Sequence, residues 1–158
     1  MDIAKKLAEL GWTLPAAPVP IASYVPAVRS GNLLFVSGQL PMRDGKLLAI
    51  GPVPSAVALD AARNAAAQCA VNALAILGAE LGGQWTQLRR VVRVGVFVNS
   101  DNGFTDQAKV ANGASELLQK VLGDAGRHAR AAVGVNTLPL GAAVEVEFIF
   151  ELTGLASS

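Results

Sequence analysis

The pattern of hydrophobic and polar positions changes period several times along the chain, and each change predicts a new element. Val144 to Phe150 alternates with a period of two, which is typical of a strand whose two faces differ. Arg89 to Asn99 has the same period, but both of its faces are largely apolar. Four further segments are extended and bounded by turn residues, so the predicted strands also include Ser23–Arg29, Leu33–Val36, Lys46–Ile50 and Ala131–Thr137.

A helical period replaces the strand pattern in three other segments. In the longest of them an apolar stripe lies between Ser55, the predicted N-cap, and the helix-stopping pair Gly82-Gly83. The shortest is amphipathic and is ended by Gly11. We therefore predict helices over Ile3–Leu10, Ser55–Leu81 and Thr105–Leu122.

Turn residues define the connections between these elements. Gly31-Asn32 is a strong hairpin signal, and Arg43-Asp44-Gly45 turns the chain again. Leu14–Pro20 holds three prolines among small residues, which predicts an extended linker because proline lacks a donor and disfavours helix before it.

The resulting order is strand, strand, short strand, helix, strand, helix, strand, strand. This order belongs to the α+β class, with both helices on one face of a single mixed sheet. We expect one domain over residues 21–155, with residues 1–20 as an N-terminal helix and proline-rich appendage. Strands that are apolar on both sides leave one sheet face uncovered, and another copy of the sheet is the expected cover.

Composition supports assembly and excludes several classes of function. The 158 residues are 52% hydrophobic and 16% charged, whereas an average protein is about a quarter charged. The formal net charge of +1 lacks the basic footprint of a nucleic-acid binder, so nucleic acid is not an expected partner. The N-terminus lacks the apolar core of a signal peptide, and we expect a cytoplasmic protein without a membrane segment.

The chain has one cysteine and one histidine. Cys69 cannot form an intrachain disulfide, and its Ala-rich helical surroundings predict a small buried residue rather than a nucleophile. Cys69 and His128 alone cannot supply a zinc site of the usual ligand types. We therefore expect neither a metal nor another cofactor.

The stretch from Gly126 to Phe150 reads as two strands joined by a turn, and it carries the candidate chemistry. Arg130 stands at the entrance of the first strand, and a carboxylate, Glu145, lies near the start of its neighbour. Arginine binds carboxylates with two parallel hydrogen bonds, and glutamate can orient water, so the pair is a candidate small-molecule site. The alternative is a pair of solvated surface groups or a weak ion pair.

Three motifs resemble the reactive intermediate deaminase (Rid) family, also called the YjgF-like or L-PSP endoribonuclease family. They occur in the expected order along nearly the whole chain from Ser23. The motifs are Ser23-Tyr24-Val25 followed by Gly31–Pro41 (Gly-Asn-Leu-Leu-Phe-Val-Ser-Gly-Gln-Leu-Pro), Val94–Asn99 (Val-Gly-Val-Phe-Val-Asn) with Phe104, and Ala129–Val135 (Ala-Arg-Ala-Ala-Val-Gly-Val) with Leu138-Pro139 and Val144–Glu147.

The resemblance implies a chorismate-mutase-like (YjgF-like) fold in a homotrimeric barrel, with ligand sites in the clefts between subunits. Arg130 matches the family arginine that holds a substrate carboxylate, and Glu145 the glutamate that orients or activates water. Tyr24 matches the site tyrosine, and Gly38 falls where the family presents backbone to the ligand. His128 lies where better-known members have proline, and the chain has an N-terminal extension. Both features indicate a divergent, longer subgroup.

The activity that the resemblance implies is hydrolysis of 2-imino acids, formed from enamines, to 2-oxo acids and ammonia without a cofactor. This is the reaction of a 2-iminobutanoate/2-iminopropanoate deaminase-like hydrolase, whose ligands are 2-imino and 2-oxo acids. Two other readings stay open. One is a non-catalytic small-molecule-binding or chaperone-like trimer using the same cleft, and the other is an endoribonuclease, as the older family name implies.

Overall fold

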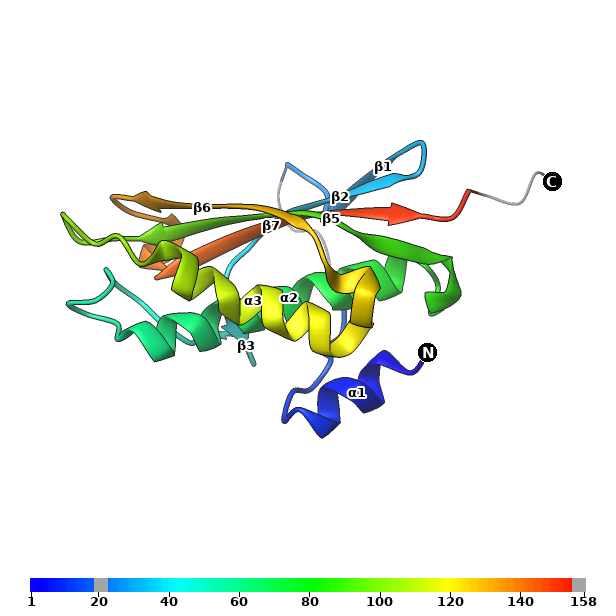
Figure 1. The fold of residues 1–158 in the computed structure, drawn as a ribbon, viewed down its shortest axis with the longest axis horizontal. Coiled ribbons are helices and arrows are strands. Elements are labelled where there is room, and N and C mark those ends of the chain that lie inside the picture. The colour runs from blue at the N-terminus through cyan, green and yellow to red at the C-terminus, as the bar shows by residue number, and fades with distance from the viewer. Residues whose placement is uncertain (19–22, 155–158) are drawn as a thin grey trace.

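A five-stranded mixed sheet and two long helices form the two main layers of the molecule (Figure 1). The computed structural model describes residues 1–18 and 23–154. The strands lie in the order β1-β2-β7-β5-β6, and all neighbours are antiparallel except β5 and β6, which are parallel. Their bounds are β1 Ala27–Ser30, β2 Leu33–Gln39, β5 Leu88–Asn99, β6 Ala129–Val135 and β7 Val144–Leu152.

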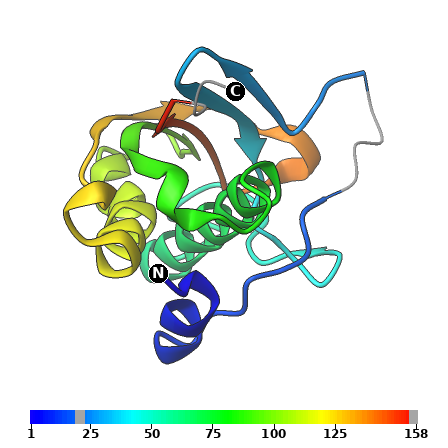
Figure 2. The ribbon, with the colours of Figure 1, turned by 90° about the vertical axis from the view of Figure 1, so that its right-hand side faces the viewer.

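Both long helices cover the same face of the sheet, as Figure 2 shows end-on. They are α2 (Leu59–Glu80) and α3 (Gln107–Leu122), and the short α1 (Ile3–Glu9) packs beneath them. The alternation in β7 explains the layering, because Val144, Val146 and Phe148 are all buried toward the helices. The predicted α+β class and the placement of both helices on one face are confirmed.

The opposite face of the sheet has no helix over it in the described part of the chain. Val28, Phe35 and Val133 on this face are 55%, 42% and 46% exposed. Val28 and Phe35 are paired on neighbouring strands, and Val133 lies on the far edge strand β6. Exposed apolar side chains at both ends of this face favour contact with another protein surface. We call this the open face, and it includes the glutamates of β7.

The strand order corrects the prediction that the last two strands are neighbours. β5 lies between β6 and β7, pairing parallel with β6 and antiparallel with β7. The physical reason is the crossover through α3: parallel strands need such a helical connection, so β6 returns beside β5 and ends at the sheet edge. The connection 136–143 then carries the chain past β5 to the other side.

Other predicted boundaries also need correction. The predicted strand Ser23–Arg29 begins only at Ala27, after Pro26, and Tyr24 lies in a bend. The predicted edge strand Lys46–Ile50 is shorter and does not join the main sheet. Instead β4 (Lys46–Leu47) pairs with β3 (Met42–Arg43) in a separate hairpin, whose turn residues Asp44 and Gly45 have positive φ. Within the predicted linker, residues 19 and 20 lie outside the described residues.

The prediction of Ser55 as an N-cap is wrong. α2 begins at Leu59 with Ala58 at its N-cap position, which makes no side-chain capping bond. Ser55 instead binds the carboxylate of Asp101, through its backbone N–H at 2.8 Å and its hydroxyl at 2.9 Å. A charged acceptor 46 positions away therefore competes successfully for the groups that would have capped the helix. α3 also begins two residues later than predicted, at Gln107.

α1 is part of the hydrophobic core. Ile3 and Leu7 are completely buried, and the Lys6 Nζ donates a hydrogen bond of 3.0 Å to the carbonyl of Val121 at the end of α3. The division of the chain near residue 20 stays a prediction, since α1 and the sheet share one core.

α2 is buried on all sides through its middle, residues 65–77, although two of these residues are amides. Gln68 donates to the Asn72 Oδ1 at 2.9 Å, and Asn72 donates to the carbonyls of Leu40 and Met42 at 3.2 and 3.0 Å. The buried amides are thus satisfied, and they tie α2 to the segment after β2. None of the helices in residues 1–18 and 23–154 is long and apolar enough to cross a membrane.

Cys69 is expected to react only slowly with a thiol reagent in the native state. The side chain is completely buried, and burial, followed by the negative charge of Glu145, raises the pKa of the thiol well above its ordinary value. The measurement is the labelling rate of native protein against that of urea-unfolded protein. Equal rates in the two states would contradict the assigned burial.

Candidate functional site

Glu145 is the second residue of β7 and lies half-buried on the open face. Burial raises the pKa of its carboxyl above the ordinary value, and the negative charge of Glu147 raises it further. A carboxylate with a raised pKa is a better proton acceptor than an ordinary surface glutamate.

Gly38 lies directly against Glu145, on the neighbouring strand. A Cβ built at position 38 would collide with the Oε1 of Glu145, so only glycine lets the carboxylate lie this close to the backbone of β2. The register of β2 against β7 shifts between Val36 and Gln39, which places one extra residue in β2 at this point. The contact and the bulge together define the local geometry of the predicted catalytic glutamate.

Tyr24 and Gly38 line one cavity of about 560 Å³. Tyr24 comes from the bend before β1 and is 66% exposed. Three of the predicted site residues, Tyr24, Gly38 and Glu145, are therefore gathered at the end of β2.

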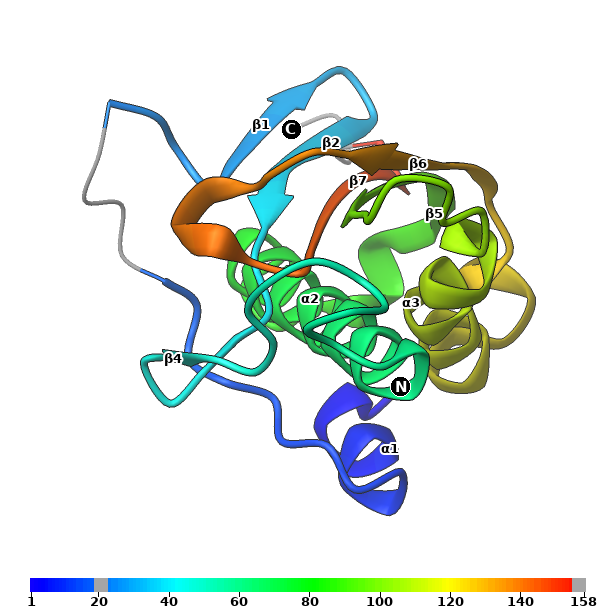
Figure 3. The ribbon, with the colours of Figure 1, turned by 90° about the vertical axis from the view of Figure 1, so that its left-hand side faces the viewer.

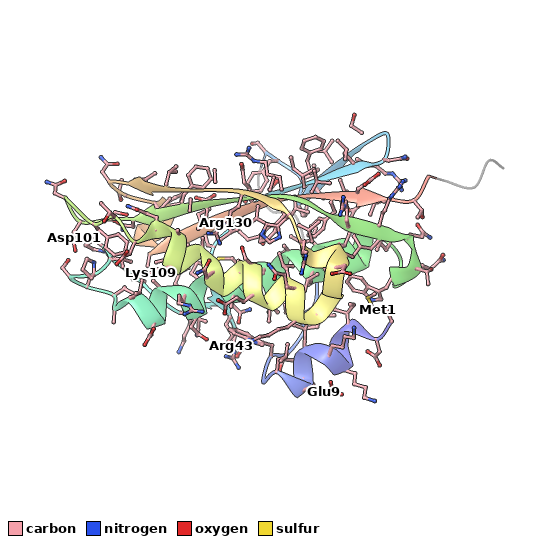
Figure 4. All side chains as sticks on the ribbon, in the orientation of Figure 1. Met1, Glu9, Arg43, Asp101, Lys109 and Arg130 are labelled. Atoms are coloured by element: carbon pink, nitrogen blue, oxygen red, sulfur yellow. The ribbon has the colours of Figure 1, made fainter. Side chains whose placement is uncertain are left out.

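Arg130 lies at the start of β6 and points toward the helix layer, as Figure 4 shows. Its Nη1 donates to the Oδ1 of Asn112 at 2.8 Å and to the Oγ of Ser115 at 3.1 Å, both on α3. In the described part of the chain, its Nε and Nη2 make no hydrogen bond. The side chain is thus held on one edge of its guanidinium and exposed on the other.

His128 completes this arrangement. Its Nδ1 lies 2.6 Å from the carbonyl of Gly126, which can only accept, so Nδ1 carries the proton and Nε2 is an acceptor in the neutral ring. The Ser115 hydroxyl therefore donates to Nε2 at 2.9 Å and keeps a lone pair for Arg130. Burial lowers the pKa of His128, the charge of Arg130 lowers it further, and the hydrogen bond to Gly126 partly opposes both effects.

Arg130 and Glu145 are not brought together within one chain. Arg130 is paired with Val94 and Glu145 with Phe97, both on β5, so they are separated by two inter-strand spacings and by three residues along β5. At about 4.8 Å per strand and 3.3 Å per residue, their Cα atoms are roughly 14 Å apart. They also lie on opposite faces, because Val94 is buried toward the helices and Phe97 faces away from them. The prediction that Arg130 and Glu145 lie at the starts of neighbouring strands is wrong, because β5 lies between β6 and β7.

The residues that position Arg130 were not predicted from the sequence. Ser115 gave the only local signal, since it is a polar residue at a buried position of α3 between Ala114 and Leu118. Asn112 is only partly buried and has no distinguishing pattern. For metals, the described residues contain no group of three His, Cys, Asp or Glu side chains that could hold an ion.

A family model described as endoribonuclease L-PSP matches residues 14–152. The chain belongs to the endoribonuclease L-PSP family. This confirms the resemblance to the Rid, or YjgF-like, proteins that the three motifs indicated.

Relatives of this L-PSP family chain align along most of its length. Protein TCP17 of Trypanosoma cruzi is 46% identical over 151 residues, 95% of this chain and 94% of that protein. A protein named 2-iminobutanoate/2-iminopropanoate deaminase, from Dermatophagoides farinae, is 31% identical over 137 residues, 85% of this chain and 90% of that protein. Among solved structures, a protein of unknown function from Agrobacterium tumefaciens is 50% identical, with a TM-score of 0.90 and coverage of 95% and 92%.

We expect the folded chain to lose stability as the pH falls from 7.5 to 5.5, in part because of His128. The unfolded histidine takes up a proton near its ordinary pKa of 6.5, while the folded one stays neutral to a lower pH. The unfolded state therefore binds more protons between the two pKa values, and stability present above pH 6.5 is lost as the pH falls through the folded pKa.

Urea unfolding of the native chain and of His128→Gln at both pH values measures this contribution. The variant should lose less stability over the same interval. Glu145 titrates with the opposite sign, because its folded pKa is raised, and it is common to both proteins. Identical pH slopes would show that the folded histidine is not held neutral.

Proposed function

We propose that the chain is a homotrimeric hydrolase that converts 2-imino acids to 2-oxo acids and ammonia. The observation that carries the proposal is the carboxylate of Glu145, with its raised pKa, lying against Gly38 beside a cavity. The choice of reaction is supported by a relative named 2-iminobutanoate/2-iminopropanoate deaminase, which aligns with 85% of this chain.

In this proposal the protein supplies orientation and one proton acceptor. Arg130 binds the substrate carboxylate with two donors, and the backbone at Gly38 and the ring of Tyr24 border the substrate. Glu145 accepts a proton from a water molecule as the water oxygen bonds to the imine carbon, and it passes that proton to the nitrogen, which gives a carbinolamine. The carbinolamine hydroxyl then loses its proton to the nitrogen by way of Glu145, the carbon–nitrogen bond breaks, and ammonia leaves as the carbon becomes a ketone. The imine carbon is already electrophilic, so placement and general-base assistance carry the reaction.

The distance between the two charged residues supports the proposed assembly. A single chain holds Arg130 and Glu145 on opposite faces of its sheet, so one copy cannot apply both to one small substrate. A cyclic assembly joins two different patches at each interface and can bring Arg130 of one copy to Glu145 of the next. The exposed apolar side chains of the open face support burial of this surface between copies.

The alternatives make different predictions for the same protein. A binding or chaperone-like trimer would bind 2-oxo acids without releasing ammonia. An endoribonuclease would need an electrostatic path for a polyanion, and the net charge of +1 does not favour it. Release of ammonia from a freshly generated 2-imino acid, with and without the protein, separates catalysis from both alternatives.

Arg130 and Glu145 should affect different steps of this reaction. Arg130→Lys keeps the charge but loses the planar pair of donors, so calorimetric binding of a 2-oxo acid should weaken markedly. Glu145→Gln keeps the shape but loses the proton acceptor, so it should leave product binding nearly intact and slow turnover by ~10²-fold or more.

Glu147 provides the matched control for Glu145. It lies on the same strand and the same open face, against Gly95, and accepts no proton in the proposed reaction. Its charge is only the second cause of the raised pKa of Glu145, after burial. Glu147→Gln should therefore reduce turnover much less than Glu145→Gln. Normal binding and turnover by Arg130→Lys would overturn the assignment of this site.

Mixed assemblies test whether the two residues come from different copies. Arg130→Ala and Glu145→Gln should each be nearly inactive alone, and the native chain should sediment as a trimer at micromolar concentration. Co-refolding the two variants in equal amounts should restore about a quarter of the native activity, because half of the chains carry the native arginine and half of their neighbours the native glutamate.

The control for complementation is a mixture of two Glu145 variants, such as Glu145→Gln with Glu145→Ala, which should stay inactive. A stable native monomer, or no recovery in the first mixture, would rule out a site shared between copies.

A further inference from the structure

The cavity beside Gly38 has walls from distant parts of the chain, and of its lining residues the proposed reaction uses only Gly38 and Tyr24. One wall is the N-terminal segment, through Pro15, Ala16 and Pro18. The facing walls include Tyr24, Met42 and Leu140. Figure 3 shows the N-terminal segment passing beside the β3–β4 hairpin, which contains Met42. The volume of about 560 Å³ is within the range of small-molecule sites.

The N-terminal wall is held in place by its attachment on the helix side. Asp2 caps α1 through a hydrogen bond of 3.0 Å from the Lys5 N–H, and the Trp12 N–H donates to the carbonyl of Leu7 at 2.9 Å. Trp12 and Leu14 pack against the core just before the wall begins. Pro15 and Pro18 then restrict the backbone that borders the cavity. Ordering this segment costs conformational entropy, and the buried contacts of α1 offset that cost.

The facing wall is held by the buried amide of Asn72. Its Nδ2 donates hydrogen bonds to the carbonyls of both Leu40 and Met42, at 3.2 and 3.0 Å. Those two carbonyls are therefore already engaged on the protein side. What the wall offers to the cavity at Met42 is mainly hydrocarbon.

The charge around the cavity is small and of one sign. Asp44, in the turn of the β3–β4 hairpin, is the one charged side chain among the described lining residues. An anionic group in the cavity would meet this carboxylate without a nearby lining cation, whereas an apolar group would replace water against the proline and methionine surfaces.

We propose that this cavity receives the side chain of the substrate and selects 2-imino acids with large apolar side chains, of the size found in leucine, methionine or phenylalanine. The inference rests on the proposed function, and Gly38 links the two parts: it lines the cavity and contacts Glu145. The reactive carbon lies at the Gly38 end, and the apolar tail extends between Ala16 and Met42. The N-terminal extension thereby acts as a wall that determines specificity.

The first experiment measures kcat/KM for ammonia release from the imino acids of leucine, alanine and glutamate, each generated in place by an amino-acid oxidase. The native protein should prefer the leucine-derived substrate over the alanine-derived one by at least roughly 10- to 200-fold. An apolar pocket gives this ratio of kcat/KM for a difference of one methylene, and the two side chains differ by more than that. The glutamate-derived substrate should be the poorest. Equal efficiency with leucine-derived and alanine-derived substrates would overturn the inference while leaving the deaminase function intact.

Two variants on opposite walls test the location of the subsite. Ala16→Trp and Met42→Trp should each lower the leucine-to-alanine preference at least tenfold, because an indole ring fills the space for the tail. Thr13→Trp is the matched control, since it adds the same ring to an exposed position of the same segment outside the cavity. Thermal unfolding confirms that each variant is folded. An unchanged preference in both wall variants, or an equal loss in Thr13→Trp, would place the subsite elsewhere.

A neutral probe separates failure of the subsite from failure of the reaction. 4-Methylpentanamide carries the leucine-like tail but neither a carboxylate nor an imine. Ligand-observed NMR should detect its binding to the native protein and to Thr13→Trp, and loss of binding in Ala16→Trp and Met42→Trp. Binding without any ammonia release would keep the apolar subsite and reject the deaminase. Ammonia release with no amide binding and no substrate preference would reject the subsite alone.

Discussion

The pairing of β5 with two different strands is the constraint on which the remaining geometry depends. β5 is parallel to β6 and antiparallel to β7, and only the parallel pair requires a helical crossover. That crossover is α3, which lies beside α2 and closes the core on one face. The same pairing puts Arg130 on the side of α3 and Glu145 on the open face. Helix placement, the uncovered face and the separation of the two charges therefore have one origin.

The sequence was most informative where structure is local. The turns at Gly31-Asn32 and Asp44-Gly45, the end of α2 before Gly82 and the alternating faces of β7 depend on nearby residues, and each was predicted. Strand order was not predictable in this way, because the neighbours of β5 lie far along the chain. Ser55 illustrates the same limit, since its partner Asp101 is distant and changes its role.

The candidate site shows this limit more sharply. The motif residues Tyr24, Gly38 and Glu145 were named from the sequence, and the structure gathers them at the end of β2. The sequence could not indicate that Asn112 and Ser115 hold Arg130, that His128 binds Ser115, or that a segment before residue 19 borders the cavity beside Gly38. These relations depend on how separate elements pack, and packing is set by the complete set of buried side chains rather than by any local period.

The contact between Gly38 and Glu145 has a consequence for how the two positions can diverge in descendants of this chain. A methyl group at position 38 occupies the space of the carboxylate oxygen, so alanine is compatible there only with a displaced or shorter side chain at position 145. Conversely, a chain that has lost the glutamate no longer needs the glycine. The two positions, 107 residues apart in sequence, are thus coupled by steric contact, and we expect a change at one of them to be accompanied by a change at the other.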